Sequence, residues 1–183
     1  MEQSQKKHAM VMLAFISVIE SIFFLIPSDV FIMAIGLSDK KKSFKAAAIA
    51  TVFSVIGGLL AYLIGAFLYD SVGQFIISSM GYTDKFSKFT ELYLQWGPWI
   101  VALGGLTPFP YKVITLASGF SRLNIFVFIF SSLIARAMRY FLIAFLIWKY
   151  GEKAREIIDR HLGKLTIIFF ALLFGSFYLI KYI

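Results

Sequence analysis

Residues 46–69 run for 24 positions without a charged side chain. As a helix, a run of this length rises about 36 Å, more than the roughly 30 Å hydrocarbon core of a bilayer. The whole chain is 60% hydrophobic, with 21 Phe, 9 Tyr and 3 Trp and a mean hydropathy of +0.82. A soluble domain could not bury that much apolar surface. We therefore expect an all-α integral membrane protein.

Two further apolar stretches, residues 9–38 and 92–121, are each interrupted near the middle. The interruptions read Ile26-Pro27-Ser28-Asp29 and Leu106-Thr107-Pro108-Phe109-Pro110. A break at bilayer depth frees backbone N–H and C=O groups that lipid cannot satisfy, so it is tolerated only where protein or a water-filled cavity surrounds it. The hairpin breaks at Pro27, Ser28, Pro108 and Pro110 therefore mark the expected working centre.

Basic residues lie on both sides of the first interrupted stretch. They are Lys6, Lys7, Lys40, Lys41, Lys42 and Lys45. If the stretch crossed the membrane once, one of these clusters would lie outside, against the positive-inside rule. A re-entrant hairpin keeps both clusters and the N-terminus in the cytoplasm. No small-x-small cleavage pattern follows the apolar run, so we do not expect a cleaved signal peptide.

The remaining segments complete an inverted repeat. Residues 46–69 are expected to cross outward, 92–121 to form a second re-entrant hairpin, and 123–148 to cross back. A last transmembrane helix, residues 165–180, would leave the C-terminus outside. The prediction is one membrane domain over residues 1–183, with two opposed hairpins each followed by a transmembrane helix, as in many secondary transporters. The alternative is five or six ordinary spans with proline kinks.

The side-chain inventory excludes several kinds of site. Cysteine is absent from the sequence, which excludes disulfides, thiolate metal sites and thiol nucleophiles. His8 and His161 lie near no plausible ligand set, so we expect no metal, no cofactor and no enzyme. The net charge is +8, but the basic residues cluster at the ends of apolar segments. That placement fits membrane topology and not nucleic-acid binding.

Two acidic residues lie within the first hairpin, Glu20 near mid-depth and Asp29 directly after the proline break. Ionisable groups at such depth are costly and usually line a cavity, a proton path or an ion site. Ser28 or Asp29 could instead simply cap the returning helix. Glu20 has no comparable structural explanation.

The second hairpin carries a candidate anion site. Thr107 is expected to be the N-cap of a half-helix that begins at Pro108, with Lys112 one turn further on. A helix N-terminus beside a lysine suits an anion. The alternative is a capped helix whose lysine extends outward to the membrane surface.

Arg136 and Arg139 lie at the centre of the span 123–148, three residues apart and therefore on one face. They need carboxylates, carbonyls or a phosphate as partners, and Glu20 and Asp29 are the expected ones. A purely structural ion-pair network is the alternative. On the preceding span, Gly57, Ala61 and Gly65 form a small-residue ridge that predicts close helix packing.

These residues, taken in order, resemble the DedA superfamily, also called the SNARE-associated or VTT-domain group, and more narrowly its YqaA-like branch. The matching positions are Glu20, Pro27-Ser28-Asp29, Gly57-Gly58, Tyr62, Gly65, Pro108, Pro110, Lys112, Gly119, Arg136 and Arg139. Many members carry an arginine-rich stretch at the second hairpin, where this chain has only Lys112.

The resemblance implies a bacterial inner-membrane protein that moves a phosphate-bearing lipid, a phospholipid or undecaprenyl phosphate, between leaflets. It implies proton coupling through Glu20 and Asp29, and phosphate binding by Thr107, Lys112, Arg136 and Arg139. The expected partners are lipids with anionic headgroups and protons, and homo-oligomers stay open. A proton-coupled carrier of a small ion or solute, and a membrane assembly factor without transport, remain the alternatives.

Overall fold

The computed structural model describes residues 2–22, 27–107, 110–151 and 153, and the predicted last span, 165–180, lies outside them. Every element in the described part of the chain is helical. The helices are α1 (Glu2–Ile22), α2 (Ser28–Ser38), α3 (Ser43–Leu68), α4 (Gln74–Ser79), α5 (Thr83–Leu106), α6 (Tyr111–Phe120) and α7 (Ile125–Tyr150). A 3-10 turn, Lys40–Lys42, precedes α3, and a π-helical turn, Tyr69–Gly73, follows it.

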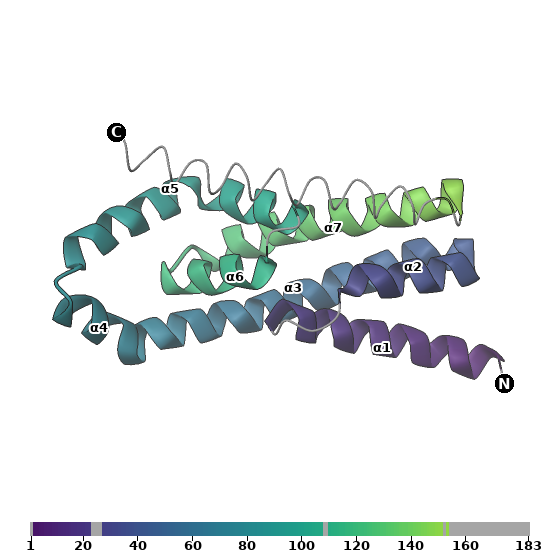
Figure 1. The fold of residues 1–183 in the computed structure, drawn as a ribbon, viewed down its shortest axis with the longest axis horizontal. Helices are drawn as coiled ribbons and strands as arrows, with labels where there is room; N and C mark the ends of the chain where they lie inside the picture. The colour runs from purple at the N-terminus through teal and green to yellow at the C-terminus, as the bar shows by residue number, and fades with distance from the viewer. Residues whose placement is uncertain (1, 23–26, 108–109, 152, 154–183) are drawn as a thin grey trace.

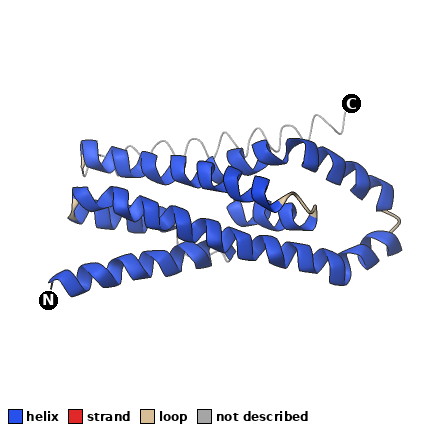
Figure 2. Cartoon of the chain, turned by 180° about the vertical axis from the view of Figure 1, so that it is seen from behind, coloured by secondary structure: helices blue, strands red, loops and turns tan. Residues whose placement is uncertain are grey.

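The chain reverses direction at both proline breaks (Figure 1). α2 runs back from the end of α1, and α6 runs back from the end of α5. Seen from behind in Figure 2, the two helix pairs enter from opposite ends of the molecule. α3 packs against α1, α2, α6 and α7, and is therefore the central helix of the fold.

Two of the described helical stretches are long and apolar enough to cross a membrane, Lys40–Ser79 and α7. The first contains the predicted span 46–69, and α7 covers residues 125–148 of the predicted span 123–148. Large apolar side chains on their outer faces remain exposed, such as Phe67 at 69% and Phe130 at 63%. Exposed groups of this kind are expected where the surrounding solvent is lipid.

The buried apolar residues form two separate clusters. One joins α1, α2, α3 and α7 around Leu13, Ile32 and Tyr140. The other joins α3, α5, α6 and α7 around Val101 and Phe128. Near the two hairpin breaks, hydrogen bonds and ion pairs connect a group of buried polar side chains that we call the polar centre. Its members include Ser28, Asp29, Ser54 and Arg136.

The small residues of α3 lie where other helices approach its backbone. A Cβ added to Gly65 would stand 2.2 Å from the carbonyl oxygen of Leu116 in α6, and one added to Gly119 would stand 1.9 Å from that of Tyr62. On the same helix, Gly57 faces the backbone of Val18 in α1. Ala61 is buried. Close approach of backbones through small residues is a common way for membrane helices to pack.

Two hydroxyl contacts add to this packing around α3. The hydroxyl of Tyr62 donates to the carbonyl of Leu123 at 2.5 Å. Gly58 lies opposite Tyr111, because an added Cβ would stand 2.7 Å from the tyrosine oxygen. These two contacts fix the start of α6, at Tyr111, and the residue that precedes α7, Leu123, relative to α3.

We expect Gly65→Ala to lower the free energy of unfolding by about 1–3 kcal/mol, because the new methyl group must push the α6 backbone away. Unfolding in mixed micelles of mild detergent and dodecyl sulfate measures the change. Ala48→Leu is the control, since Ala48 lies on the exposed face of the same helix. Equal stability of Gly65→Ala and the wild type would contradict the close packing.

Candidate functional site

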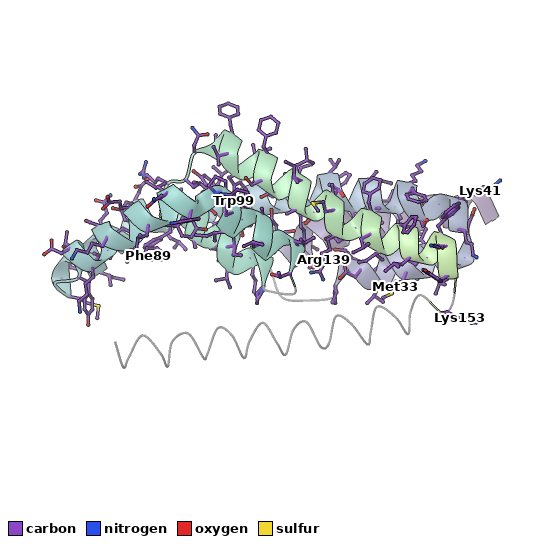
Figure 3. The ribbon with its side chains drawn as sticks, turned by 90° about the horizontal axis from the view of Figure 1, so that it is seen from above. Met33, Lys41, Phe89, Trp99, Arg139 and Lys153 are labelled. Atoms are coloured by element: carbon purple, nitrogen blue, oxygen red, sulfur yellow. The ribbon has the colours of Figure 1, made fainter. Side chains whose placement is uncertain are left out.

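Arg139 joins the two hairpin breaks. Its Nη2 lies 2.5 Å from Oδ2 of Asp29 and its Nε donates to Oδ1 at 3.5 Å, while Nη1 donates to the carbonyl of Thr107 at 2.8 Å. The side chains of Arg139 and Asp29 are 16% and 9% exposed. Figure 3 shows Arg139 near the middle of the molecule, between Trp99 toward one end and Lys41 at the other. One guanidinium thus connects α7 to the start of α2 and the end of α5.

Arg136, one turn earlier on α7, is only 3% exposed. Its Nε donates to the hydroxyl of Ser54 at 2.7 Å, and its Nη2 lies 3.7 Å from Oε1 of Glu20. The guanidinium carbon also lies 4.5 Å and 4.9 Å from the ring centres of Tyr111 and Tyr140. A cation between two aromatic faces is stabilised by the quadrupoles of the rings. Arg136 is therefore fixed in place by three kinds of contact.

Glu20 reaches across the first break to the start of α2. Its Oε2 accepts the backbone N–H of Ser28 at 2.8 Å and also the Ser28 hydroxyl. Carboxylates are favourable at helix N-termini, where backbone N–H groups are unpaired. The residue at the N-cap, Pro27, supplies no side-chain cap. The idea that Ser28 or Asp29 caps this helix is therefore wrong, because the carboxylate of Glu20 from α1 takes that role.

The two breaks are thus closed by charged side chains in complementary ways. Glu20 meets the positive N-terminal end of α2, and Arg139 meets the last carbonyl of the α5 end, at Thr107. Lipid offers no hydrogen bonds to such helix ends, so a break within a membrane needs protein groups of this kind. The charged residues therefore satisfy backbone groups that the two chain reversals leave unpaired.

The helix after the second break begins later than the sequence pattern predicts. α6 starts at Tyr111, with Pro110 at its N-cap and no side-chain cap. The prediction that the half-helix begins at Pro108 and is capped by Thr107 is wrong. Pro110 disfavours α-helical geometry in the residue before it, so a helix is more easily started after the second proline than through it. Lys112 is consequently in the first turn of α6, half-buried, next to Tyr111.

Four buried polar atoms near Arg136 make no hydrogen bond within the described structure. They are the hydroxyls of Thr107, Tyr111 and Ser132 and the Nη2 of Arg136. The Tyr111 and Ser132 hydroxyls lie close to each other, so they form one polar pair beside Arg136 and not two isolated groups. Ser132 lies one helical turn before Arg136, on the same face of α7. Leaving a buried donor unsatisfied costs about 1–3 kcal/mol. These groups therefore remain able to donate hydrogen bonds to a polar partner.

Several residues around Arg136 and Arg139 could not be recognised as part of the site from the sequence. Ser54 lies in the uncharged run of α3, and its hydroxyl shares a hydrogen bond of 2.9 Å with Ser21. Tyr140 is fully buried, and its hydroxyl lies 3.2 Å from that of Ser28. Single hydroxyls are common in membrane helices, so only their meeting in space distinguishes them. No group of three or more potential metal ligands occurs among the described residues.

In charge terms the cluster is balanced, with two guanidinium groups against two carboxylates. Arg139 and Asp29 form a close two-contact pair, whereas Arg136 and Glu20 stand further apart. A guanidinium can hold a phosphate as well as a carboxylate. The arrangement can therefore exchange one anion for another at Arg136, provided that the charge of Glu20 is removed or displaced.

Comparisons with known proteins agree with the membrane fold. Residues 26–149 match the family described as the VTT domain. An uncharacterised protein of Haemophilus influenzae is 37% identical over 163 residues, which cover 87% of this chain and 84% of the relative. An uncharacterised protein of Histophilus somni, described as a homologue of HI0703, is 31% identical over 87% of this chain and 85% of its own length. No solved structure matches.

Proposed function

Because the chain belongs to the DedA superfamily of VTT-domain membrane proteins, we propose that it is a transporter that moves a phosphate-bearing lipid between the leaflets of the bacterial inner membrane. Its substrate would be a phospholipid or undecaprenyl phosphate. The observation that carries the proposal is Arg136, a nearly buried cation whose Nη2 makes no hydrogen bond and lies 3.7 Å from its carboxylate partner Glu20.

In the proposed architecture, the two reversals are re-entrant hairpins and α3 and α7 cross the bilayer. The N-terminus lies in the cytoplasm, and residues 165–180 cross once more to place the C-terminus outside. The opposed entry of the two helix pairs in Figure 1 supports this inverted repeat. Rocking of one repeat against the other would expose the polar centre to each side in turn.

The phosphate would bind at Arg136, with the hydroxyls of Tyr111 and Ser132 as further donors and Lys112 at the entrance. Arg139 and Thr107 would complete the polar wall. A phosphate oxygen accepts several hydrogen bonds at once, and it would satisfy donors that the protein alone leaves unpaired. The acyl chains would remain in the bilayer, beside the exposed apolar faces of the helices.

Proton coupling follows from charge balance. When an anionic headgroup reaches Arg136, it competes with the carboxylate of Glu20, which lies 3.7 Å from Nη2. Protonation of Glu20 removes that competing charge, so a proton would enter with the phosphate and leave after its release. Asp29 would act in the same way on Arg139, more weakly, because their pair is closer.

A leaflet-exchange assay in proteoliposomes tests the proposal, with fluorescent phospholipid and polyprenyl phosphate, each with and without a pH gradient. We expect the wild type to exchange at least one of the two lipids. Arg136→Gln is expected to slow exchange at least about tenfold, which is the effect of losing one charged hydrogen bond.

Arg122→Gln is the matched control, because Arg122 is exposed and pairs with Asp70 far from the centre. Both variants must first show unfolding transitions near that of the wild type. If folded wild type exchanges neither lipid, the lipid proposal fails in favour of a solute carrier or an assembly factor. If Arg136→Gln reduces only the protein level and leaves exchange per molecule unchanged, the arginine is structural.

A further inference from the structure

A groove of about 700 Å³ lies between α1 and α3, outside the polar centre. From α1 it is lined by Val11, Phe15 and Ile19 among others, and from α3 by Ile49 and Phe53. Val11 and Phe15 are 65% and 70% exposed, so the groove is open along its side. We refer to it as the α1–α3 groove.

One end of the groove is basic. Lys42 and Lys45 line it there, and Lys40 and Lys41 precede them in the chain. Lys42 contacts Asp39, with 3.4 Å between Nζ and Oδ2. Lys45 is exposed and has no acidic partner among the residues that the structure describes. Even after Asp39 is counted, this end keeps an excess of positive charge.

The part of α3 that lines the groove is close to one leaflet in length. α1 and α3 run in the same direction in Figure 1, so the basic end lies beside Val11 and the far end beside Ile19 and Phe53. From Lys45 to Phe53 the helix rises about 12 Å. Half of a hydrocarbon core of about 30 Å is close to this length. A lysine at the membrane surface would thus stand above an apolar channel that reaches toward the bilayer centre.

We propose that the α1–α3 groove is a binding site for one membrane lipid with an anionic phosphate headgroup. The headgroup would lie against Lys42 and Lys45, and one acyl chain would fill the groove between Phe15 and Ile49. Charge and length both match a lipid in its normal orientation within a leaflet. The site is separate from the polar centre; it rests on the proposed membrane placement of α1 and α3, and not on the proposed transport.

Photo-crosslinking of the full chain tests this site. The full-length variant Phe15→p-benzoylphenylalanine is reconstituted in nanodiscs of one part phosphatidylglycerol to nine parts phosphatidylcholine. After illumination, the lipids that are crosslinked to it are identified by mass spectrometry. We expect the ratio of anionic to neutral adducts to exceed the bilayer ratio about fivefold, which corresponds to one effective lysine contact. The same probe at Phe126, exposed at the start of α7, is expected to report the bilayer ratio.

Charge variants complete the test. Lys42→Gln with Lys45→Gln should return the ratio at Phe15 to the bilayer value, whereas Lys85→Gln with Lys88→Gln, on α5, should leave it raised. If the first pair does not fold, Lys45→Gln alone must lower the ratio.

Three results would overturn the proposal. The first is an equal ratio of anionic to neutral lipid adducts at Phe15 and Phe126. The second is a crosslink from Phe15 to another copy of the protein, and the third is a crosslink from Phe15 to residues 154–183. If the wild type exchanges no lipid but anionic lipid is enriched in the adducts at Phe15, the transport proposal is wrong and the lipid site is supported.

Discussion

Arg139→Gln is expected to lower the free energy of unfolding by about 3–5 kcal/mol, the cost of leaving one member of a buried ion pair uncompensated. Asp29 is 9% exposed and loses both of its contacts to the guanidinium in this variant. The last carbonyl beside the second break, at Thr107, loses its donor as well. The substitution therefore removes a stabilising contact from both helical hairpins.

A double-mutant cycle separates the pair from its surroundings. Asp29→Asn should destabilise by a similar amount, and the combination with Arg139→Gln by less than the sum, because neither unpaired charge remains. Unfolding in mixed micelles provides the three values. The control is Arg122→Gln, whose exposed pair with Asp70 should contribute less than about 1 kcal/mol. Strict additivity in the cycle would show that the buried residues do not act as a pair.

Glu20→Ala is expected to cost about 3 kcal/mol, because it removes the counter-charge of a nearly buried arginine and the acceptor at the start of α2. Glu20→Gln keeps an oxygen that can accept the Ser28 N–H, so it should cost distinctly less. The difference between the two variants measures the capping contribution, typically about 1 kcal/mol.

Glu20→Gln also probes proton coupling. Glu20→Gln imitates a permanently protonated carboxyl group, so lipid exchange should continue but lose its acceleration by a pH gradient. Exchange rates with and without the gradient provide the test, alongside Arg122→Gln as the unaffected control. Full retention of the acceleration in Glu20→Gln would exclude Glu20 as the coupling group and leave Asp29 as the candidate.

The sequence predicted the features that depend on one local pattern. The uncharged run of residues 46–69 and the span 123–148 correspond to long apolar helices, because hydrophobic length alone selects a membrane-crossing helix. The break at Pro27 was equally readable, since proline lacks the N–H that a continuing helix needs. The expected partners of Arg136 and Arg139 also stand beside them, because buried charges in an apolar chain have few alternatives.

The local patterns failed where two signals competed. With prolines at positions 108 and 110, either could open the second half-helix, and only the folded chain shows that α6 starts at Tyr111. The cap of α2 comes from Glu20, eight residues earlier and on another helix. A capping rule that looks at neighbouring residues cannot find such a partner.

What the sequence by itself determined is therefore the class of protein, the crossing helices and the small set of charges that must meet. What only the tertiary structure decided is how they meet: Arg136 on Ser54 and between two tyrosine rings, Arg139 across both breaks, and a lysine-tipped groove beside α1. The physical reason is the distance along the chain over which each kind of interaction acts. Hydrophobic length and proline act on the residues around them, whereas hydrogen bonds and ion pairs join positions up to 112 residues apart, which become neighbours only when the helices pack.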